Sequence, residues 1–220
     1  MILSRFRRSL VLPGVLMTGA WTMAPGQQTV ETFDTASAGQ PPPGFSFAAM
    51  RQPAPGAFTV HRTTTGGHVV HTADAAATGF SLAIAPGGAP SDLTVSVRMR
   101  LASGSRAGGV VWRYVDARNF YAAILDLQRA EISLYRVSNG NMIRIEQERE
   151  LELDVEAWHT LKVVHDNAEV RVSLGGIRVF TDDERRHDRL LPEGRVGLLS
   201  GGAAEVWFDD LRIAPDRRRR

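Results

Sequence analysis

Acidic residues at alternating positions past the middle of the chain are the first candidates for chemistry. On a strand, Glu152, Asp154 and Glu156 would share one face at intervals of about 6.5–7 Å, so their carboxylates could flank a glycosidic bond. The spacing continues backwards, and acids occupy six successive even positions: Glu146, Glu148, Glu150, Glu152, Asp154 and Glu156. Apolar residues such as Leu151 and Leu153 lie between them. This alternation is typical of a strand with one solvated face, so we assign it no catalytic residue.

A second group of residues has the composition of a sugar-binding site. Residues 109–137 contain four of the seven Trp and Tyr residues of the protein, together with arginines and aspartates. Sugars are bound by contact with aromatic rings and by bidentate hydrogen bonds from planar charged groups. The candidate ligand-binding residues are Trp112, Arg113, Tyr121, Asp126, Tyr135 and Arg136, with Arg113 and Tyr121 as the first choices. The alternative is that the aromatic rings belong partly to the core and the arginines pair with acids outside it.

Three aspartates could form the rim of a structural calcium site. Asp34 lies near the start of the predicted domain, whereas Asp209 and Asp210 lie near its end. Calcium prefers carboxylate and backbone carbonyl oxygens, which these positions supply if the two ends of the domain meet. His68 and His71 would point to opposite faces of a strand, so they are not predicted to chelate zinc as a pair. No other cofactor is predicted, because the sequence lacks a phosphate loop and a dinucleotide fingerprint.

The elements that must position these side chains are predicted to be strands, because apolar residues alternate with polar ones along most of the chain. The clearest example is Leu93–Leu101, and we expect Trp158 and Trp207 to anchor the core. The predicted strands are 57–62, 68–72, 80–85, 93–101, 109–114, 120–127, 131–137, 142–148, 158–165, 169–174, 195–200 and 205–213. Pairs such as Asn139-Gly140 suit tight hairpins between them. The pattern predicts an all-β, two-sheet antiparallel jelly-roll sandwich.

Several local motifs occur in an order that resembles a known group of domains. The matching stretches are Glu31-Thr32-Phe33-Asp34, Gly108 to Tyr114, Asn119-Phe120-Tyr121, Ser133 to Val137, Trp158 to Val163, Gly194 to Leu198 and Phe208 to Leu211. Over residues 29–214 the chain resembles laminin-G-like and concanavalin A-like jelly-roll domains. The resemblance is to the secreted bacterial branch described as 3-keto-disaccharide hydrolase-like or as similar to family-16 glycoside hydrolases. It implies a jelly roll, whereas activity is left open because this scaffold carries lectins, hydrolases and adhesion modules.

The N-terminus has the layout of a secretory signal peptide. Three arginines are followed by an apolar stretch over 10–23 and by small residues around 24–26, where cleavage is expected. We therefore predict a signal peptide over 1–26, one domain over 27–214 and a disordered arginine-rich tail over 215–220. The protein contains no cysteine and is predicted to be periplasmic or extracellular without disulfides. No membrane span is predicted.

The charge balance of the predicted mature chain argues against nucleic acid as a partner. The full chain has 26 basic and 24 acidic residues, and removal of the three N-terminal arginines leaves 23 bases against 24 acids. Four of these bases are Arg217–Arg220, so the remaining body is net acidic. A nucleic-acid-binding domain would instead present a basic face.

Three functions remain open at this point. The leading hypothesis is an exported module that binds a carbohydrate or glycoconjugate without catalysis. The alternative is a periplasmic hydrolase of a glycoside or a 3-keto-disaccharide, and the third is a structural module without a small ligand. A hydrolase requires a concave site that holds two carboxylates in different environments, whereas a structural module requires no groove. The sequence does not predict the oligomeric state.

Overall fold

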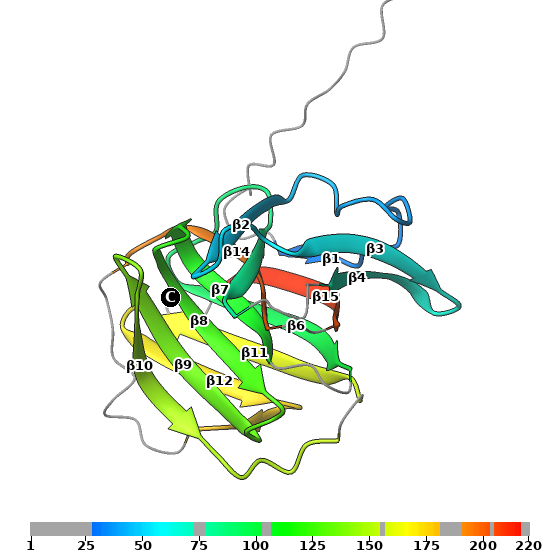
Figure 1. Ribbon diagram of the computed structural model, residues 1–220. Helices are drawn as coiled ribbons and strands as arrows, with labels where there is room; N and C mark the ends of the chain where they lie inside the picture. Colours follow the sequence, from blue (N-terminus) through cyan, green and yellow to red (C-terminus); the bar gives the residue numbers. More distant parts are fainter. Residues whose placement is uncertain are drawn as a thin grey trace, which may run out of the picture.

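Strands alone form the regular secondary structure of the described residues, and they make two antiparallel sheets packed face to face (Figure 1). The computed structural model describes residues 28–72, 78–102, 107–154, 157–180, 191–202 and 205–216. The predicted signal peptide and the arginines at 217–220 lie outside these ranges. Within them, no helix is long and apolar enough to cross a membrane.

The first sheet, called sheet A, has eight strands. Its order is β13 (Ile177–Arg178), β12 (Glu169–Leu174), β11 (His159–Asp166), β6 (Leu93–Leu101), β15 (Val206–Pro215), β4 (Gly66–Thr72) and β3 (Ala57–Thr63). The eighth strand, β1 (Thr29–Glu31), pairs with the end of β15, where Thr29 lies opposite Ile213. The first and last strands of the described chain are therefore neighbours.

The second sheet, called sheet B, has seven strands and faces the viewer in Figure 1. Its order is β10 (Asn141–Glu148), β9 (Glu131–Ser138), β8 (Asn119–Asp126), β7 (Ala107–Asp116), β14 (Arg195–Gly201), β5 (Phe80–Ile84) and β2 (Ser46–Met50). The strands β7 to β10 follow one another along the chain as hairpins. The rest of the sheet is assembled from distant segments, which is the usual topology of a jelly roll.

The predicted all-β sandwich is confirmed, and each of the twelve predicted strands matches a strand of the structure to within two residues at either end. Three strands were missed. Two of them, β1 and β13, contain only three and two residues, which is too short to display an alternating pattern. The third, β2, is a five-residue edge strand with the sequence Ser-Phe-Ala-Ala-Met, whose two alanines obscure the alternation.

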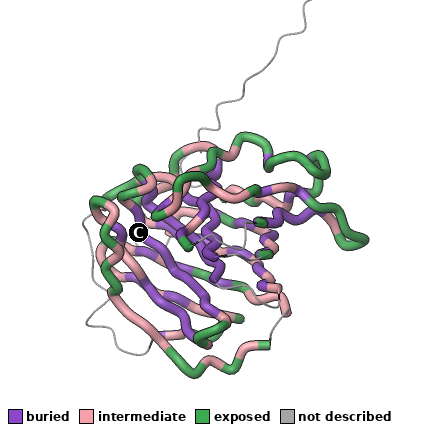
Figure 2. Tube along the Cα trace, in the orientation of Figure 1, coloured by how far each residue is buried: buried purple, intermediate pink, exposed green. Residues whose placement is uncertain are grey.

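The main core lies between the two sheets, and strict alternation along β6 shows how the sequence specifies it. Every odd residue from Leu93 to Leu101 is fully buried, while every even residue is partly exposed on the outside of sheet A. On a strand, such alternation places all the apolar side chains on one face. Figure 2 shows the resulting layer of buried chain within the sandwich.

The outer face of sheet B is also apolar. Buried side chains on this face form a second cluster that includes Leu82, Val111, Phe120, Ile124 and Leu199. As a result, β7 and β8 are buried along most of their length, and their sequences show runs of apolar residues instead of alternation. Such runs are expected of a strand that is covered on both faces.

The expectation that Trp158 and Trp207 anchor the core is wrong. Both rings are half-buried on the outer face of sheet A, because Trp207 alternates with the inward-facing Val206 and Phe208. The tryptophan of the core is Trp112, which is fully buried and donates a hydrogen bond from Nε1 to His165 Nδ1 at 2.9 Å. The ring of Tyr121 is stacked beside it with centroids 5.7 Å apart.

Arg113 lies at a β-bulge in the middle of sheet B. Its φ of 47° breaks the alternation, so Trp112 points into the core while Tyr114 belongs to the outer cluster. Gly194 permits the distortion, because a Cβ there would lie 2.4 Å from the Arg113 carbonyl carbon. The Arg113 guanidinium is buried and donates to the backbone carbonyls of three loop residues: Ser91, Leu191 and Asn167. It therefore holds loops from both sheets together.

The acidic alternation of residues 146–156 is only partly in a strand. β10 ends at Glu148, where the predicted strand 142–148 also ends, and residues 151–154 lead toward β11 without regular structure. Leu151 and Leu153 nevertheless pack against the core, while Glu152 and Asp154 are exposed, as the alternation predicted. Glu156 lies outside the described residues.

Replacement of Trp112 by alanine is expected to destabilise the protein by about 3–5 kcal/mol, because it leaves a cavity between the sheets and removes the hydrogen bond to His165. Trp207→Ala is the matched control and should cost less, since its ring is half-exposed. Urea unfolding of the two variants measures the difference. Equal losses would contradict the assignment of Trp112 as the core tryptophan.

Replacement of Arg113 by alanine is expected to cost about 3 kcal/mol or more, since it leaves buried carbonyls without a charged donor. Arg113→Lys should also destabilise, because an ammonium cannot reproduce the planar fork that reaches three loops. The same urea titration tests both variants. A midpoint that does not change in either variant would show that the loops are held without the guanidinium.

Candidate functional site

A cavity of about 350 Å³ lies on the outer face of sheet B, at the end where β8 finishes and β9 begins. Six strands contribute to it: Phe80 from β5, Ala107 from β7, Ile124 and Asp126 from β8, Glu131, Ser133 and Tyr135 from β9, Met142 from β10, and Gly201 from β14. The small residues at 107 and 201 leave room above the sheet. Its volume is at the lower end of the range for small-molecule sites.

Two carboxylates form the polar side of the cavity. Asp126 and Glu131 lie directly opposite each other across β8 and β9, and both are buried. Arg129, in the turn between the strands, lies between them: its Nη1 is 3.7 Å from Asp126 Oδ2 and 3.8 Å from Glu131 Oε1. Gln147 donates a hydrogen bond to Glu131, and Arg149 Nε lies 3.5 Å from Glu131 Oε2. Polar groups thus fix the direction of both carboxylates.

Ser133 provides a hydroxyl group that is not used within the described protein. Its side chain lines the cavity one pair of residues further along β9 from Glu131, and it is only 2% exposed. The Oγ atom is buried and has no hydrogen-bond partner among the described residues. A buried hydroxyl that is left unpaired costs free energy, so it marks a position where a water molecule or a ligand atom is expected.

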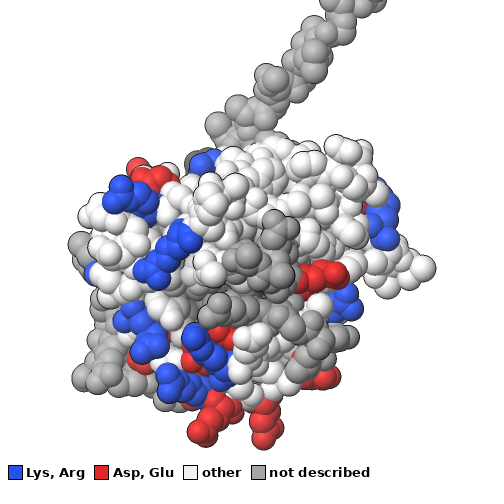
Figure 3. All heavy atoms as spheres, viewed as in Figure 1, with Lys and Arg blue, Asp and Glu red and all other residues white. Residues whose placement is uncertain are grey.

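The opposite side of the cavity is apolar. Ile124 and Phe80 belong to the second hydrophobic cluster, and Tyr135 and Met142 pack against it from β9 and β10. Figure 3 shows that charged side chains on this face gather over β8, β9 and β10, while the surface over β2 and β3 is mostly uncharged. The cavity therefore lies where the apolar outer face of sheet B meets its charged part.

Only two of the six predicted ligand residues line this cavity, namely Asp126 and Tyr135. Trp112 and Tyr121 are fully enclosed between the sheets, and Arg113 is committed to loop carbonyls, so these three side chains are inaccessible to a ligand in this structure. Arg136 alternates with Tyr135 and therefore points to the opposite face of β9. Asp126 and Tyr135 therefore remain candidates for this site.

Arg129, Glu131 and Ser133 were not among the predicted ligand residues, although they lie at the cavity. A readable signal was present, since a short turn between two predicted strands places Asp126 opposite Glu131, and alternation then places Ser133 on the same face. The contributions of Phe80, Ala107 and Gly201 depend on strand pairings that are distant in sequence, and no local pattern indicates them.

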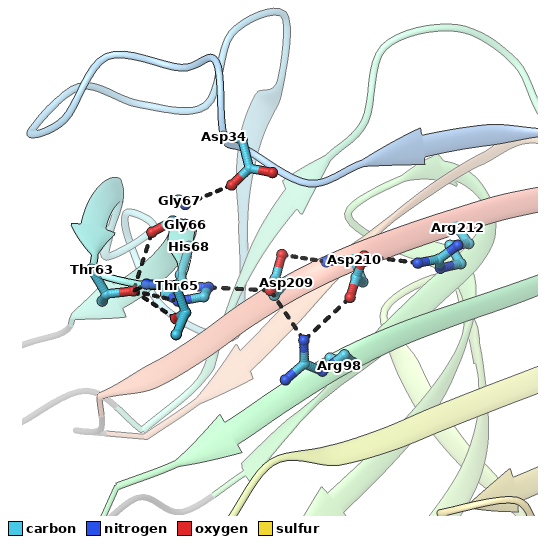
Figure 4. A network of polar contacts seen from close by, with 10 residues as sticks. All are labelled: Asp34, Thr63, Thr65, Gly66, Gly67, His68, Arg98, Asp209, Asp210 and Arg212. Atoms are coloured by element: carbon cyan, nitrogen blue, oxygen red, sulfur yellow. Dashed lines mark hydrogen bonds and ion pairs between the residues drawn. The ribbon is translucent and has the colours of Figure 1, made fainter.

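The three aspartates predicted to bind calcium are engaged by other partners (Figure 4). Arg98 Nη1 lies 3.5 Å from Asp209 and 3.3 Å from Asp210, and Arg212 Nη2 lies 2.9 Å from Asp210. Asp34 points instead to the start of β4, where it accepts a hydrogen bond of 2.8 Å from the Gly67 N–H.

This donor set does not fit a calcium ion. Guanidinium groups occupy the positions that a cation would take beside Asp209 and Asp210, and His68 Nδ1 lies 3.3 Å from Asp209 Oδ2. Burial raises the pKa of the Asp209 carboxyl, whereas the hydrogen bond from Gly67 lowers the pKa of Asp34. The described residues contain no group of three or more histidine, cysteine or acidic side chains arranged to hold a metal.

Comparison with known proteins finds likeness at the level of structure. No family model matches the sequence, and no curated protein matches it. Among solved structures, carbohydrate-binding module CBM66 from Bacillus subtilis has a TM-score of 0.60 at 20% identity, covering 76% of this chain and 94% of that one.

Two further solved structures are similar to the chain. Domain 4 of a GH43 extracellular arabinanase from Geobacillus stearothermophilus, in complex with arabinotriose, has a TM-score of 0.55 at 15% identity and covers 86% of this chain and 93% of that domain. A β-glucanase from Bacillus licheniformis has a TM-score of 0.56 at 13% identity, covering 88% and 100%. At these identities the likeness concerns the fold, and the chain has the predicted concanavalin A-like jelly-roll sandwich fold.

Proposed function

We propose that the protein binds a carbohydrate in the cavity on the outer face of sheet B. The observation that carries this proposal is the buried Ser133 hydroxyl, which lacks a partner among the described residues and lies beside two fixed carboxylates in a cavity of about 350 Å³. A ligand with several hydroxyl groups satisfies all of these groups at once. A purely structural module gives no reason to keep an unpaired hydroxyl at the bottom of a cavity.

The two sides of the cavity match the two kinds of surface on a sugar ring. Asp126 and Glu131 offer carboxylate oxygens that accept hydrogen bonds from hydroxyl groups, and Arg129 offers donors. Tyr135 and Ile124 offer apolar surface to the C–H groups of the ring. The small volume suits a terminal or short saccharide better than the middle of a long chain.

Structural neighbours add support of a general kind. One neighbour is a carbohydrate-binding module, and another is a domain that was solved with arabinotriose bound. Fold alone does not determine function, so the cavity is the main support for carbohydrate binding. The structural neighbours are consistent with it. Export by the N-terminal segment 1–26 is part of the proposal, since it would place the protein where extracellular glycans occur.

Hydrolysis of a glycoside is the second candidate, and the cross-strand pair Asp126 and Glu131 favours it. Directly opposed residues on antiparallel strands have Cβ atoms about 4.5–5.5 Å apart, which is close to the carboxyl separation of about 5–5.5 Å in retaining glycosidases. Against it, the same Arg129 side chain contacts both carboxylates. An acid–base pair requires two different environments, which a shared arginine does not create.

Binding is tested by screening the full-length chain on a glycan array and then titrating the best glycan by calorimetry. Ser133→Ala is expected to keep the melting temperature of the parent, since no hydrogen bond within the described protein is lost, while the Kd rises because the ligand loses a partner. Asp126→Asn is expected to raise the Kd about tenfold or more. Glu152→Gln, an exposed acid outside the cavity, is the matched control and should bind as the parent does.

Unchanged affinity in both cavity variants would exclude this cavity as the binding site. The same glycans, incubated with the protein and analysed for cleavage products, distinguish the two candidate functions. Cleavage by the parent that is abolished in Asp126→Asn and Glu131→Gln would favour the hydrolase, whereas binding without cleavage supports the module.

A further inference from the structure

A second cluster of aromatic and basic side chains lies on the opposite side of the molecule, on the outer face of sheet A. Arg98 and Arg100 point outward from β6, Trp207 points outward from β15, and Trp158 precedes β11. We call these four residues the Trp–Arg platform. The two tryptophans and the two arginines are all partly exposed, so their side chains form part of the molecular surface.

Arg100 lies between the two indole rings of the platform. Its guanidinium carbon is 4.6 Å from the centre of the Trp207 ring and 6.0 Å from the centre of the Trp158 ring. Arg100 and Trp207 are direct cross-strand partners on β6 and β15, which fixes their relative position. Cation–π contacts therefore restrain the guanidinium without using its hydrogen-bond donors.

Of the two arginines of the platform, only Arg98 has an anionic partner among the described residues. Arg98 is paired with Asp209 and Asp210, as Figure 4 shows. Arg100 has no ion pair and no hydrogen bond with any described residue, and its Nε atom is buried and unpaired. A restrained guanidinium with unpaired donors is prepared for an oxyanion, since little entropy remains to be lost when the anion binds.

We propose that the Trp–Arg platform is a second binding site, which takes the carboxylate or sulfate group of an anionic glycan. The guanidinium of Arg100 receives the oxyanion through its planar fork of donors. The tryptophan edges beside it offer apolar surface to the sugar ring that carries this group. This site is separate from the cavity, because it lies on the other sheet and shares no residue with it.

Charge around the platform favours a glycan over an anionic membrane surface. Three acids lie close to the platform: β15, which carries Trp207, also carries Asp209 and Asp210, and Glu205 directly precedes this strand. Trp207 Nε1 donates a hydrogen bond to Glu205. These acids would repel a dense layer of anionic headgroups, whereas one uronate or sulfate group can approach Arg100 alone.

The test is calorimetric titration of the full-length chain with oligogalacturonate, with a sulfated oligosaccharide and with a neutral oligosaccharide of similar length. The parent is expected to bind at least one of the anionic probes more tightly than the neutral one. Arg100→Gln should weaken this binding about tenfold or more, because charge-assisted hydrogen bonds are lost. Arg100→Lys, which keeps the charge but lacks the fork, should also bind more weakly than the parent.

Lys162→Gln is the matched control. Lys162 is exposed on the same face of sheet A and lies opposite Ser96, two residues from Arg98 along β6. Its replacement removes the same charge. It should leave the Kd unchanged. Equal weakening in Arg100→Gln and Lys162→Gln would mean that the anion senses only net charge, and it would overturn the proposal.

Three other results would also overturn the proposal. They are no preference of the parent for either anionic probe, unchanged affinity in both Arg100 variants, and equally strong Arg100-dependent binding to vesicles that contain phosphatidylserine. The melting temperature of each variant shows whether a loss of affinity results from unfolding. Ser133→Ala should retain the anionic binding, so the platform and the cavity can each fail without the other.

Discussion

The Arg113 guanidinium joins the two sheets at one end of the sandwich, and much of the architecture depends on it. It donates to carbonyls in the loop between β5 and β6, in the turn between β11 and β12, and in the segment before β14. Its bulge also decides which face of β7 each neighbour takes, so Trp112 enters the core and Tyr114 the outer cluster. A buried arginine whose guanidinium donates to three loop carbonyls is therefore a structural residue, although its chemistry would suit ligand binding.

Sheet B carries hydrophobic side chains on both faces, and the cavity arises where this second hydrophobic surface ends. Ile124 and Tyr135 belong to the apolar surface, whereas Asp126 is the last residue of β8 and Glu131 is the first residue of β9. Fixed carboxylates and apolar walls therefore meet within one small cavity. This combination lets a site recognise both the hydroxyl groups and the carbon skeleton of a ligand.

The sequence was sufficient to predict twelve of the described strands, because alternation is a local property that β6 displays over nine residues. It was insufficient to predict which aromatic residues are buried. Trp112 and Trp207 both lie in strands with apolar neighbours, and only the pairing of the two sheets decides that one ring points inward and the other outward. Asp126 was recognised by its type, while the cavity around it also depends on Phe80 and Gly201, which reach it through long-range pairing.

The pairing of β1 with β15 affects how the domain would respond to mechanical force. Thr29 lies opposite Ile213, so the outer ends of the first and last strands leave the sheet side by side. If tension is applied at these two points, the hydrogen bonds between the strands break one after another, as in a zipper, and do not share the load. At low force the fold would therefore open first between β1 and β15, whereas β15 itself stays paired with β6 on one side and β4 on the other until those hydrogen bonds also break.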